Sequence, residues 1–149
     1  MQQSKIVYTL GTSNRLSETF FSLLDSQGIR AIADVRRFPK SKRFPHFDRG
    51  ELESSAERMH ITYSWMGNLL GGFREESYEV YRKNPAYLDG LEQLERLALS
   101  LPTAVVCAER LPWKCHRFQI AQDLEEREWQ IIHIIDRGNF WRPGNGRRS

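Results

Sequence analysis

The sequence contains only two cysteines in 149 residues, Cys107 and Cys115. So few thiols do not form the disulfide framework that stabilises small secreted domains. The first residues, Met1-Gln-Gln-Ser-Lys, lack the pattern of a signal peptide. We therefore expect a cytoplasmic protein in which both cysteines are free thiols.

Long hydrophobic runs are also missing, because no apolar stretch approaches the roughly 18 residues that span a membrane. No membrane partner is expected. Internal repeats and low-complexity segments are absent. The length suits one domain with a proper core, and 40% hydrophobic with 28% charged residues is ordinary for a globular protein. We predict a single domain over residues 1–140 and a polar, basic tail over residues 141–149.

Three common functional motifs are absent. The chain has no nucleophile-elbow serine, no phosphate loop of the G-x-x-x-x-G-K-[S/T] type and no dinucleotide-binding G-x-G-x-x-G. No cofactor is therefore predicted. The net charge of +3 and a pI near 9.0 are compatible with anionic partners.

Apolar runs that alternate with segments of helical periodicity predict an α/β fold. The expected strands cover residues 6–10, 29–35, 62–66, 103–107 and 130–135. The expected helices cover residues 16–27, 51–60, 85–101 and 115–128. This order predicts a single three-layer domain with a mostly parallel sheet flanked by helices. It is Rossmann-like, without the dinucleotide fingerprint.

Polar residues directly follow three of the predicted strands. They are Thr12 and Ser13, then Asp34, Arg36 and Arg37, and then Glu109 with the Cys115-His116-Arg117 segment. Parallel strands would bring these residues to one edge of the sheet, where α/β proteins bind their ligands. We expect Arg36, Arg37, His116 and Arg117 to bind an anionic substrate there.

Cys115 is a candidate nucleophile or redox thiol, because a helix start beside Lys114 and His116 favours the thiolate. The alternative is a buried packing residue, which is also our interpretation of Cys107. A metal site is not predicted. Seven residues separate the cysteines, and the side chains of Cys115 and His116 are expected to diverge.

Asp34 and Glu109 are candidate acid–base groups, because each ends an apolar strand where burial raises the pKa of a carboxyl group. Alternatively, they form ion pairs with nearby arginines that only hold the loops. The amides and hydroxyls of Thr12 and Ser13 suit an anion at a helix start. The alternative is a plain helix cap by Ser13 or Asn14.

The segment 36–49 contains six Lys or Arg residues and three phenylalanines, a combination that suits phosphate pairing and base stacking. A solvated loop anchored by its phenylalanines is the alternative. His133 lies inside the last predicted strand, where we expect a histidine with satisfied hydrogen bonds.

Five motifs occur in order along the chain. They are Gly11-Thr-Ser13, Asp34-Val-Arg-Arg-Phe-Pro-Lys-Ser41, Leu70-Gly-Gly72, Cys107-Ala-Glu109 with Cys115-His-Arg117, and Ile132-His-Ile134. Through them the chain resembles the domain of unknown function 488 family, from about Ile6 to Ile135. The resemblance implies a compact, cytosolic bacterial or archaeal α/β domain, and it implies no activity.

Two functions remain open. The first is a small enzyme acting on a phosphorylated, nucleotide or nucleic-acid substrate, with Asp34, Glu109 and Cys115 as catalytic candidates. The second is a nucleic-acid or nucleotide binding module without turnover. Carboxylate, thiol and guanidinium groups at one edge favour the enzyme, and the absence of a known catalytic motif favours the module. The sequence does not predict an oligomeric state.

Overall fold

The computed structural model describes residues 5–72 and 74–142. Its strands are β1 (Ile6–Gly11), β2 (Ala31–Asp34), β3 (Thr62–Trp65), β4 (Thr103–Cys107), β5 (Gln130–Asp136) and β6 (Asn139–Trp141). Its α-helices are α1 (Ser17–Ser26), α2 (Arg49–Arg58), α3 (Gly67–Leu70), α4 (Tyr78–Tyr81), α5 (Pro85–Ser100) and α6 (Arg117–Glu126). Two short 3-10 helices, η1 (Pro45–Phe47) and η2 (Pro112–Lys114), lie in loops.

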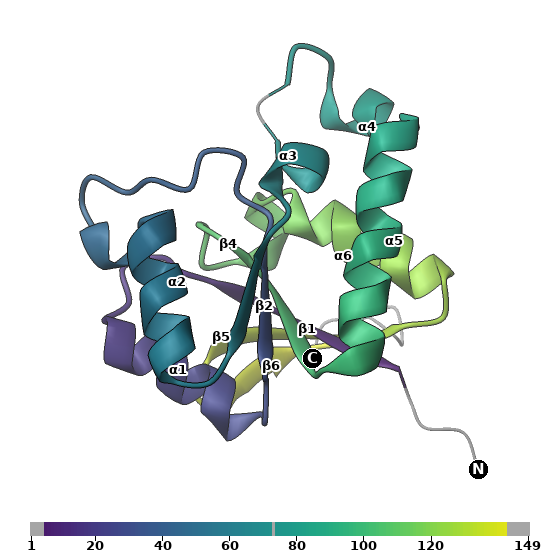
Figure 1. Cartoon of the computed structure of the whole chain (residues 1–149). Coiled ribbons are helices and arrows are strands. Elements are labelled where there is room, and N and C mark those ends of the chain that lie inside the picture. The colour runs from purple at the N-terminus through teal and green to yellow at the C-terminus, as the bar shows by residue number, and fades with distance from the viewer. Residues whose placement is uncertain (1–4, 73, 143–149) are drawn as a thin grey trace.

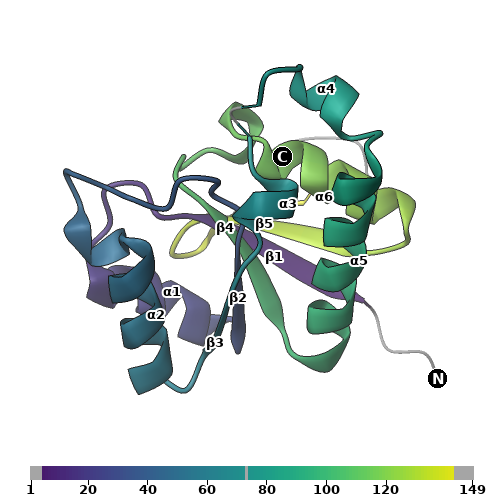
Figure 2. The same ribbon diagram turned by 45° about the horizontal axis from the view of Figure 1, so that its top comes forward.

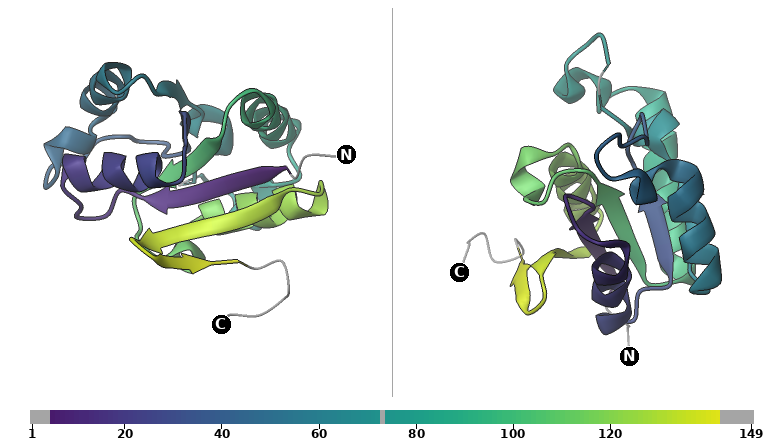
Figure 3. Two further views of the ribbon diagram at one scale, coloured as in Figure 1. Left: turned by 90° about the horizontal axis from the view of Figure 1, so that it is seen from below. Right: turned by 90° about the vertical axis from the view of Figure 1, so that its left-hand side faces the viewer.

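One six-stranded sheet forms the centre of the molecule, in the order β3-β2-β4-β1-β5-β6 (Figure 1). Strands β1 to β5 are parallel, and β6 is antiparallel to β5 at one edge. The left view of Figure 3 shows this β5–β6 ribbon along the lower edge. The predicted α/β fold with a mostly parallel sheet is therefore confirmed.

Helices cover both faces of the sheet. One core cluster joins α1 and α2 to the sheet, and the other joins α5 and α6 to its opposite face (Figure 2). Strand β4 shows why both faces are apolar. Ala104 and Val106 belong to the first cluster, whereas Val105 and Cys107 belong to the second. A strand buried on both faces reads as a continuous apolar run, as the sequence does here.

Strand β6 is an element that the sequence analysis missed. The chain reverses after β5 through Gly138, whose φ of 71° is the left-handed conformation that glycine adopts readily. Trp141 therefore belongs to the sheet, although the predicted tail began at residue 141. Residues 143–149 of that predicted tail lie outside the described residues. In the described part of the chain, no helix has the length and apolar character needed to cross a membrane.

The helix that follows β4 and the helices that follow its two neighbouring strands lie on opposite faces of the sheet. β1 and β2 continue into α1 and α2 on one face, whereas β4 continues into α6 on the other. The register pairs Gly11 with Cys107 and Asp34 with Val106, so the three strands end at nearly the same level. This divergence is the topological switch point at which open α/β sheets form a ligand crevice.

Candidate functional site

A cavity of about 500 Å³ lies beyond the carboxyl ends of β1, β2 and β4. Among the described residues, its lining contains five cationic side chains and one carboxylate, that of Glu109. The cationic residues are Arg36, Arg37, Lys40, Arg43 and Arg110. Asn14, His116 and three hydroxyl residues, Thr12, Ser13 and Ser41, add polar groups, and Phe38 and Phe44 add aromatic rings. We call this the rim cavity.

Six of the nine predicted site residues line the rim cavity. They are Thr12, Ser13, Arg36, Arg37, Glu109 and His116. The other three, Asp34, Cys115 and Arg117, are not in its lining. The structure therefore brings most of the predicted binding residues together but keeps two of the three predicted catalytic groups away from the cavity.

Asp34 is fully buried and is committed to hydrogen bonds at the end of β2. Its carboxylate accepts bonds from Arg36 Nε at 2.9 Å, from Arg36 Nη2 at 2.8 Å and from the Tyr63 hydroxyl at 2.5 Å. Burial alone would lower the pKa of Arg36, but the hydrogen bonds and charge of Asp34 outweigh it and raise that pKa. Burial and the Asp34 charge likewise raise the pKa of Tyr63. Of the two interpretations of Asp34, these contacts match the loop-holding ion pair.

The backbone amides of Thr12 and Ser13 are already engaged in hydrogen bonds. They donate to the carbonyl oxygens of Cys107 and Ala108 at 2.7 and 2.8 Å, which ties the end of β1 to the end of β4. The prediction that these amides bind an anion is therefore wrong. The predicted alternative of a side-chain cap is wrong too, because the N-cap of α1 is Leu16 and no side chain caps it.

Arg117 is completely buried at the first position of α6. Its guanidinium donates to Thr9 Oγ1 at 3.2 Å and to the backbone carbonyls of Glu109 at 2.6 Å and Arg110 at 3.0 Å. Burial, together with the charge of Arg15, lowers the pKa of Arg117 to about 9. The hydrogen bonds of Arg117 therefore fix the backbone of the loop after β4. Glu109 and Arg110 of this loop line the rim cavity.

The two cysteines form a disulfide between the end of β4 and the residue before the N-cap of α6. The prediction of free thiols is therefore wrong. That prediction rested on the small number of cysteines and on the absence of a signal-peptide pattern, and neither indicates whether the two side chains meet in the fold. The loop between the cysteines turns back through η2, and this return brings the two sulfur atoms together.

His116 lies between the rim cavity and the disulfide. Its Nε2 is 2.9 Å from the carbonyl oxygen of Val35, and its Nδ1 is 3.7 Å from Cys115 Sγ. Burial lowers the pKa of His116, although the Val35 bond opposes this shift. The expectation that the side chains of Cys115 and His116 diverge is therefore wrong.

Glu109 is exposed at the mouth of the rim cavity on a loop that fits tightly against β1. A Cβ atom at Gly11 would lie 1.8 Å from the Glu109 carbonyl oxygen. Glycine at position 11 thus allows the loop to approach the end of β1 closely. This contact, with the Arg117 hydrogen bonds, sets the position of the only carboxylate that lines the cavity.

Sequence reasoning missed several residues of the rim cavity. Lys40 and Arg43 belong to the basic segment 36–49, but the sequence left open whether they are simply solvated. Within that segment Phe47 is buried against Phe20, as an anchoring role requires, whereas Phe38 is 65% exposed. Arg110 could not be predicted, because its ion pair with Asp136 joins the loop after β4 to the end of β5, two segments that are distant in sequence.

His133 is buried in β5, and one of its two ring nitrogens has a hydrogen-bond partner among the described residues. Its Nδ1 lies 2.6 Å from Thr9 Oγ1, as the pairing of β1 with β5 requires. Its Nε2 has no hydrogen-bond partner among the described residues. Burial and the charge of Arg117 lower the pKa of His133 to about 3, so the ring is neutral at pH 7. The expected satisfied histidine is found for one ring nitrogen only.

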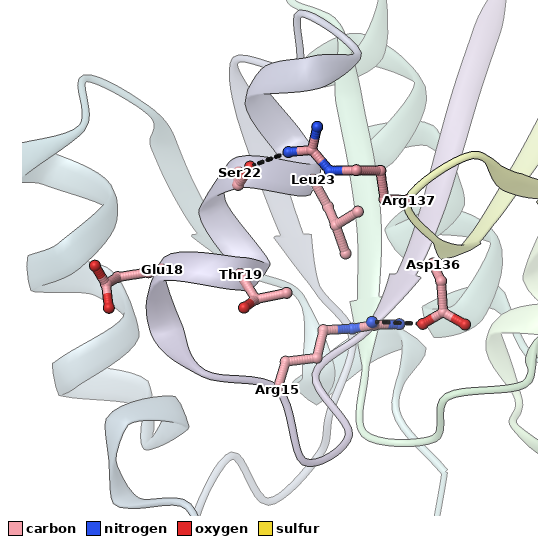
Figure 4. Close-up of a pocket in the computed structure, with 7 residues that line it drawn as sticks. All are labelled: Arg15, Glu18, Thr19, Ser22, Leu23, Asp136 and Arg137. Carbon is pink, nitrogen blue, oxygen red and sulfur yellow. Dashed lines mark hydrogen bonds and ion pairs between the residues drawn. The ribbon is translucent and has the colours of Figure 1, made fainter.

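A second cavity, of about 450 Å³, lies between α1 and the turn after β5 (Figure 4). Arg15 and Arg137 line it, but both are engaged. Arg15 forms an ion pair with Asp136 at 3.2 Å, and Arg137 donates to Ser22 at 2.8 Å. With Glu18 and Asp136 also present, the cationic groups are balanced. The rim cavity is therefore the better candidate for an anion.

Residues 16–124 match the family described as Domain of unknown function DUF488. The chain belongs to this family. The DUF488 segment contains β2, β3, β4, most of α6 and most of the rim cavity, whereas Thr12, Ser13 and β5 lie outside it. The name assigns no activity. Neither the curated proteins nor the solved structures include a match to this chain.

Proposed function

We propose that the rim cavity binds a phosphorylated ligand and that the protein is a small enzyme acting on a phosphorylated, nucleotide or nucleic-acid substrate. The observation that carries the proposal is the cationic lining of a cavity at the topological switch point. Arg36 and Arg110 form ion pairs with Asp34 and Asp136, and Arg37, Lys40 and Arg43 add three further cations against the one carboxylate of Glu109. Guanidinium groups are well suited to phosphate, because their donors match its oxygens in pairs. In a crevice, such a charge excess also concentrates anions.

The size and aromatic content of the rim cavity favour a nucleotide over a bare inorganic anion. Phe38 is 65% exposed and lines both the rim cavity and an adjoining hollow of about 690 Å³. Arg37 and Lys40 also line both hollows. A phosphate held by these cations would leave a base within reach of the Phe38 ring, and base–aromatic stacking contributes about 1–3 kcal/mol.

Glu109 and His116 are the groups that we assign to chemistry. Glu109 is the one carboxylate in the rim cavity, and His116 lines the same cavity. The Val35 carbonyl can only accept a hydrogen bond, so the His116 proton resides on Nε2 and a lone pair on Nδ1. A lone pair on a neutral imidazole is a competent general base. We do not assign acid–base chemistry to Asp34, because its carboxylate forms a buried ion pair with Arg36.

We also propose a cytoplasmic location. A cytoplasmic protein meets a reducing environment, in which a disulfide between Cys107 and Cys115 would be opened to two thiols. The loop after β4 would remain held in that state by the hydrogen bonds from Arg117.

The binding part is tested by thermal unfolding with inorganic phosphate, sulfate and a panel of nucleotides. A ligand at 100 times its Kd stabilises the native state by about 2.7 kcal/mol. We expect a rise in Tm that is reduced in Arg37→Ala and Lys40→Ala. Arg137→Ala, in the second cavity, is the matched control and should keep the full rise. An equal rise in all three variants would place the anion elsewhere.

The catalytic part is tested by following candidate phosphorylated substrates with phosphorus NMR. We expect turnover that Glu109→Gln abolishes, while the ligand-dependent rise in Tm remains. Binding without turnover for any ligand that raises Tm would instead support the alternative, a binding module for nucleotides or nucleic acid.

A further inference from the structure

We propose that the reduced protein binds a zinc-type metal ion through Cys107, Cys115 and His116. The two sulfur atoms and a ring nitrogen of the histidine all lie within 4.8 Å of one another. The proposal goes beyond the function proposed above and does not depend on it, because metal binding is measured without any anionic ligand. In the metal-bound state the Nδ1 lone pair of His116 ligates the ion, and Glu109 is then the acid–base group of the rim cavity.

The orientation of His116 is the first argument. Its Nε2 donates to the Val35 carbonyl at 2.9 Å, which leaves the lone pair on Nδ1, the nitrogen 3.7 Å from Cys115 Sγ. Histidines that ligate metals almost always donate their other ring N–H to a carbonyl, a carboxylate or water. The ring is therefore already held in the tautomer and direction that a metal ligand needs.

The surroundings of the three donors also favour binding. Cys107 is 4% exposed at the end of β4, and Cys115 is partly buried against the same core cluster. The Nδ1 atom of His116 lies 3.7 Å from Cys115 Sγ, so the three donors meet at one partly buried point of the fold.

The donor types indicate which metal fits. Two thiolates and one imidazole suit zinc, whereas magnesium and calcium prefer oxygen ligands. Three protein ligands are the number found in catalytic zinc sites, where the fourth position is taken by water or substrate. His116 also lines the rim cavity, so a metal ion held by this residue would lie beside the candidate anion site.

The disulfide is the oxidised, metal-free state of the same two sulfur atoms. A dithiol reductant opens it by giving two electrons and two protons, so that two thiols form and the reductant becomes a disulfide. Zinc then displaces both thiol protons. The Cα atoms of Cys107 and Cys115 are 7.3 Å apart, beyond the roughly 4.4–6.8 Å of most disulfides. The reduced sulfur atoms therefore have room to separate around an ion.

The test uses the full chain, reduced with a phosphine under anaerobic conditions and titrated with cobalt(II) as a spectroscopic substitute for zinc. We expect one equivalent to bind, with a thiolate-to-cobalt charge-transfer band and the intense visible bands of a tetrahedral site. Zinc should displace cobalt and remove both the charge-transfer band and the visible bands. The oxidised protein should show neither band. Equal binding by oxidised protein, or no charge-transfer band after reduction, would overturn the proposal.

Variants separate these ligands from adventitious sites. Cys107→Ser and Cys115→Ser should each weaken or remove the charge-transfer band. His116→Ala should weaken binding by at least the roughly tenfold that loss of a ligand's hydrogen-bond partner costs. His46→Ala is the matched control, because His46 Nε2 also bonds a backbone carbonyl, that of Arg15 at 2.8 Å, outside the cysteine cluster. Circular dichroism checks that each variant folds. If the spectra of folded His116→Ala and His46→Ala coincide, His116 is not a ligand and the proposed site is wrong.

Discussion

Arg36 and Asp34, two residues apart at the end of β2, form a buried ion pair with two hydrogen bonds of 2.9 and 2.8 Å. Their side chains are only 8% and 0% exposed. Removing one partner from such a pair leaves an uncompensated buried charge and costs about 3–5 kcal/mol. We therefore predict that Arg36→Ala lowers the free energy of unfolding by several kcal/mol, as measured by urea denaturation.

Lys42→Ala is the control for this prediction, because Lys42 is exposed on the loop that follows Arg36. Its substitution should change the free energy of unfolding by less than about 0.5 kcal/mol. If Arg36→Ala is as mild as Lys42→Ala, Asp34 does not depend on Arg36. Arg36 would then be available to bind an anion.

Arg117 makes three hydrogen bonds from a completely buried position, two of them to the loop that carries Glu109. Arg117→Met should leave those carbonyl oxygens without their donor, at about 1–3 kcal/mol for each buried group left unsatisfied. We predict a loss of at least about 2 kcal/mol in urea denaturation. Lys114→Met, at an exposed neighbouring position, should be nearly neutral. If Arg117→Met leaves the free energy of unfolding unchanged, the loop after β4 keeps its conformation without the Arg117 hydrogen bonds.

Gly11 is required where the loop after β4 crosses the end of β1. A Cβ atom there would meet the backbone of Glu109 and Arg110, which cannot rotate away as a side chain could. We predict that Gly11→Ala destabilises the fold by about 1–3 kcal/mol, the usual cost of overpacking. Thermal and urea unfolding measure it.

Gly50→Ala is the matched control. Gly50 lies in α2, and a Cβ atom at this position would have nothing within 4 Å of it. Alanine is the better helix former by about 0.8–1.0 kcal/mol, so this variant should be as stable as the parent or more stable. The predicted close contact would be refuted by a Gly11→Ala protein that unfolds at the same urea concentration as Gly50→Ala.

His133 should make the fold sensitive to acid. Its pKa is lowered from 6.5 to about 3 in the folded state, so below pH 6.5 the unfolded chain binds a proton that the native protein does not. Stability from this group is therefore present above pH 6.5 and is lost as the pH falls toward 3. The limiting slope for one proton is about 1.4 kcal/mol per pH unit.

His133→Gln removes this proton and should reduce the pH dependence between about pH 6 and pH 5 by close to that slope. Urea denaturation across this range measures the change. The same variant at about pH 7.5, where residue 133 is neutral in both states of the parent, reports the packing cost alone. An unchanged slope in the variant would show that His133 takes up its proton in the native state.

The sequence by itself determined the α/β architecture. The apolar run at 103–107 and the helical periodicity at 85–101 predicted β4 and α5 correctly, because burial on both faces or on one stripe leaves a direct pattern. Parallel strands then placed the polar residues after β1, β2 and β4 at one edge, as the register shows. Strand β6 was not predicted, because a strand of three residues after a short turn shows too little periodicity to be recognised in the sequence.

Only the tertiary structure decided what each polar side chain at that edge does. Three interactions depend on side-chain direction. They are the disulfide, the hydrogen bonds of Asp34 with Arg36 and Tyr63, and the hydrogen bonds that the buried Arg117 makes to the loop after β4. They also depend on close approach between segments far apart in the chain. A strand pattern specifies which residues reach the edge of the sheet. Whether a residue there meets a partner or faces a cavity depends on loops whose paths no short sequence period encodes.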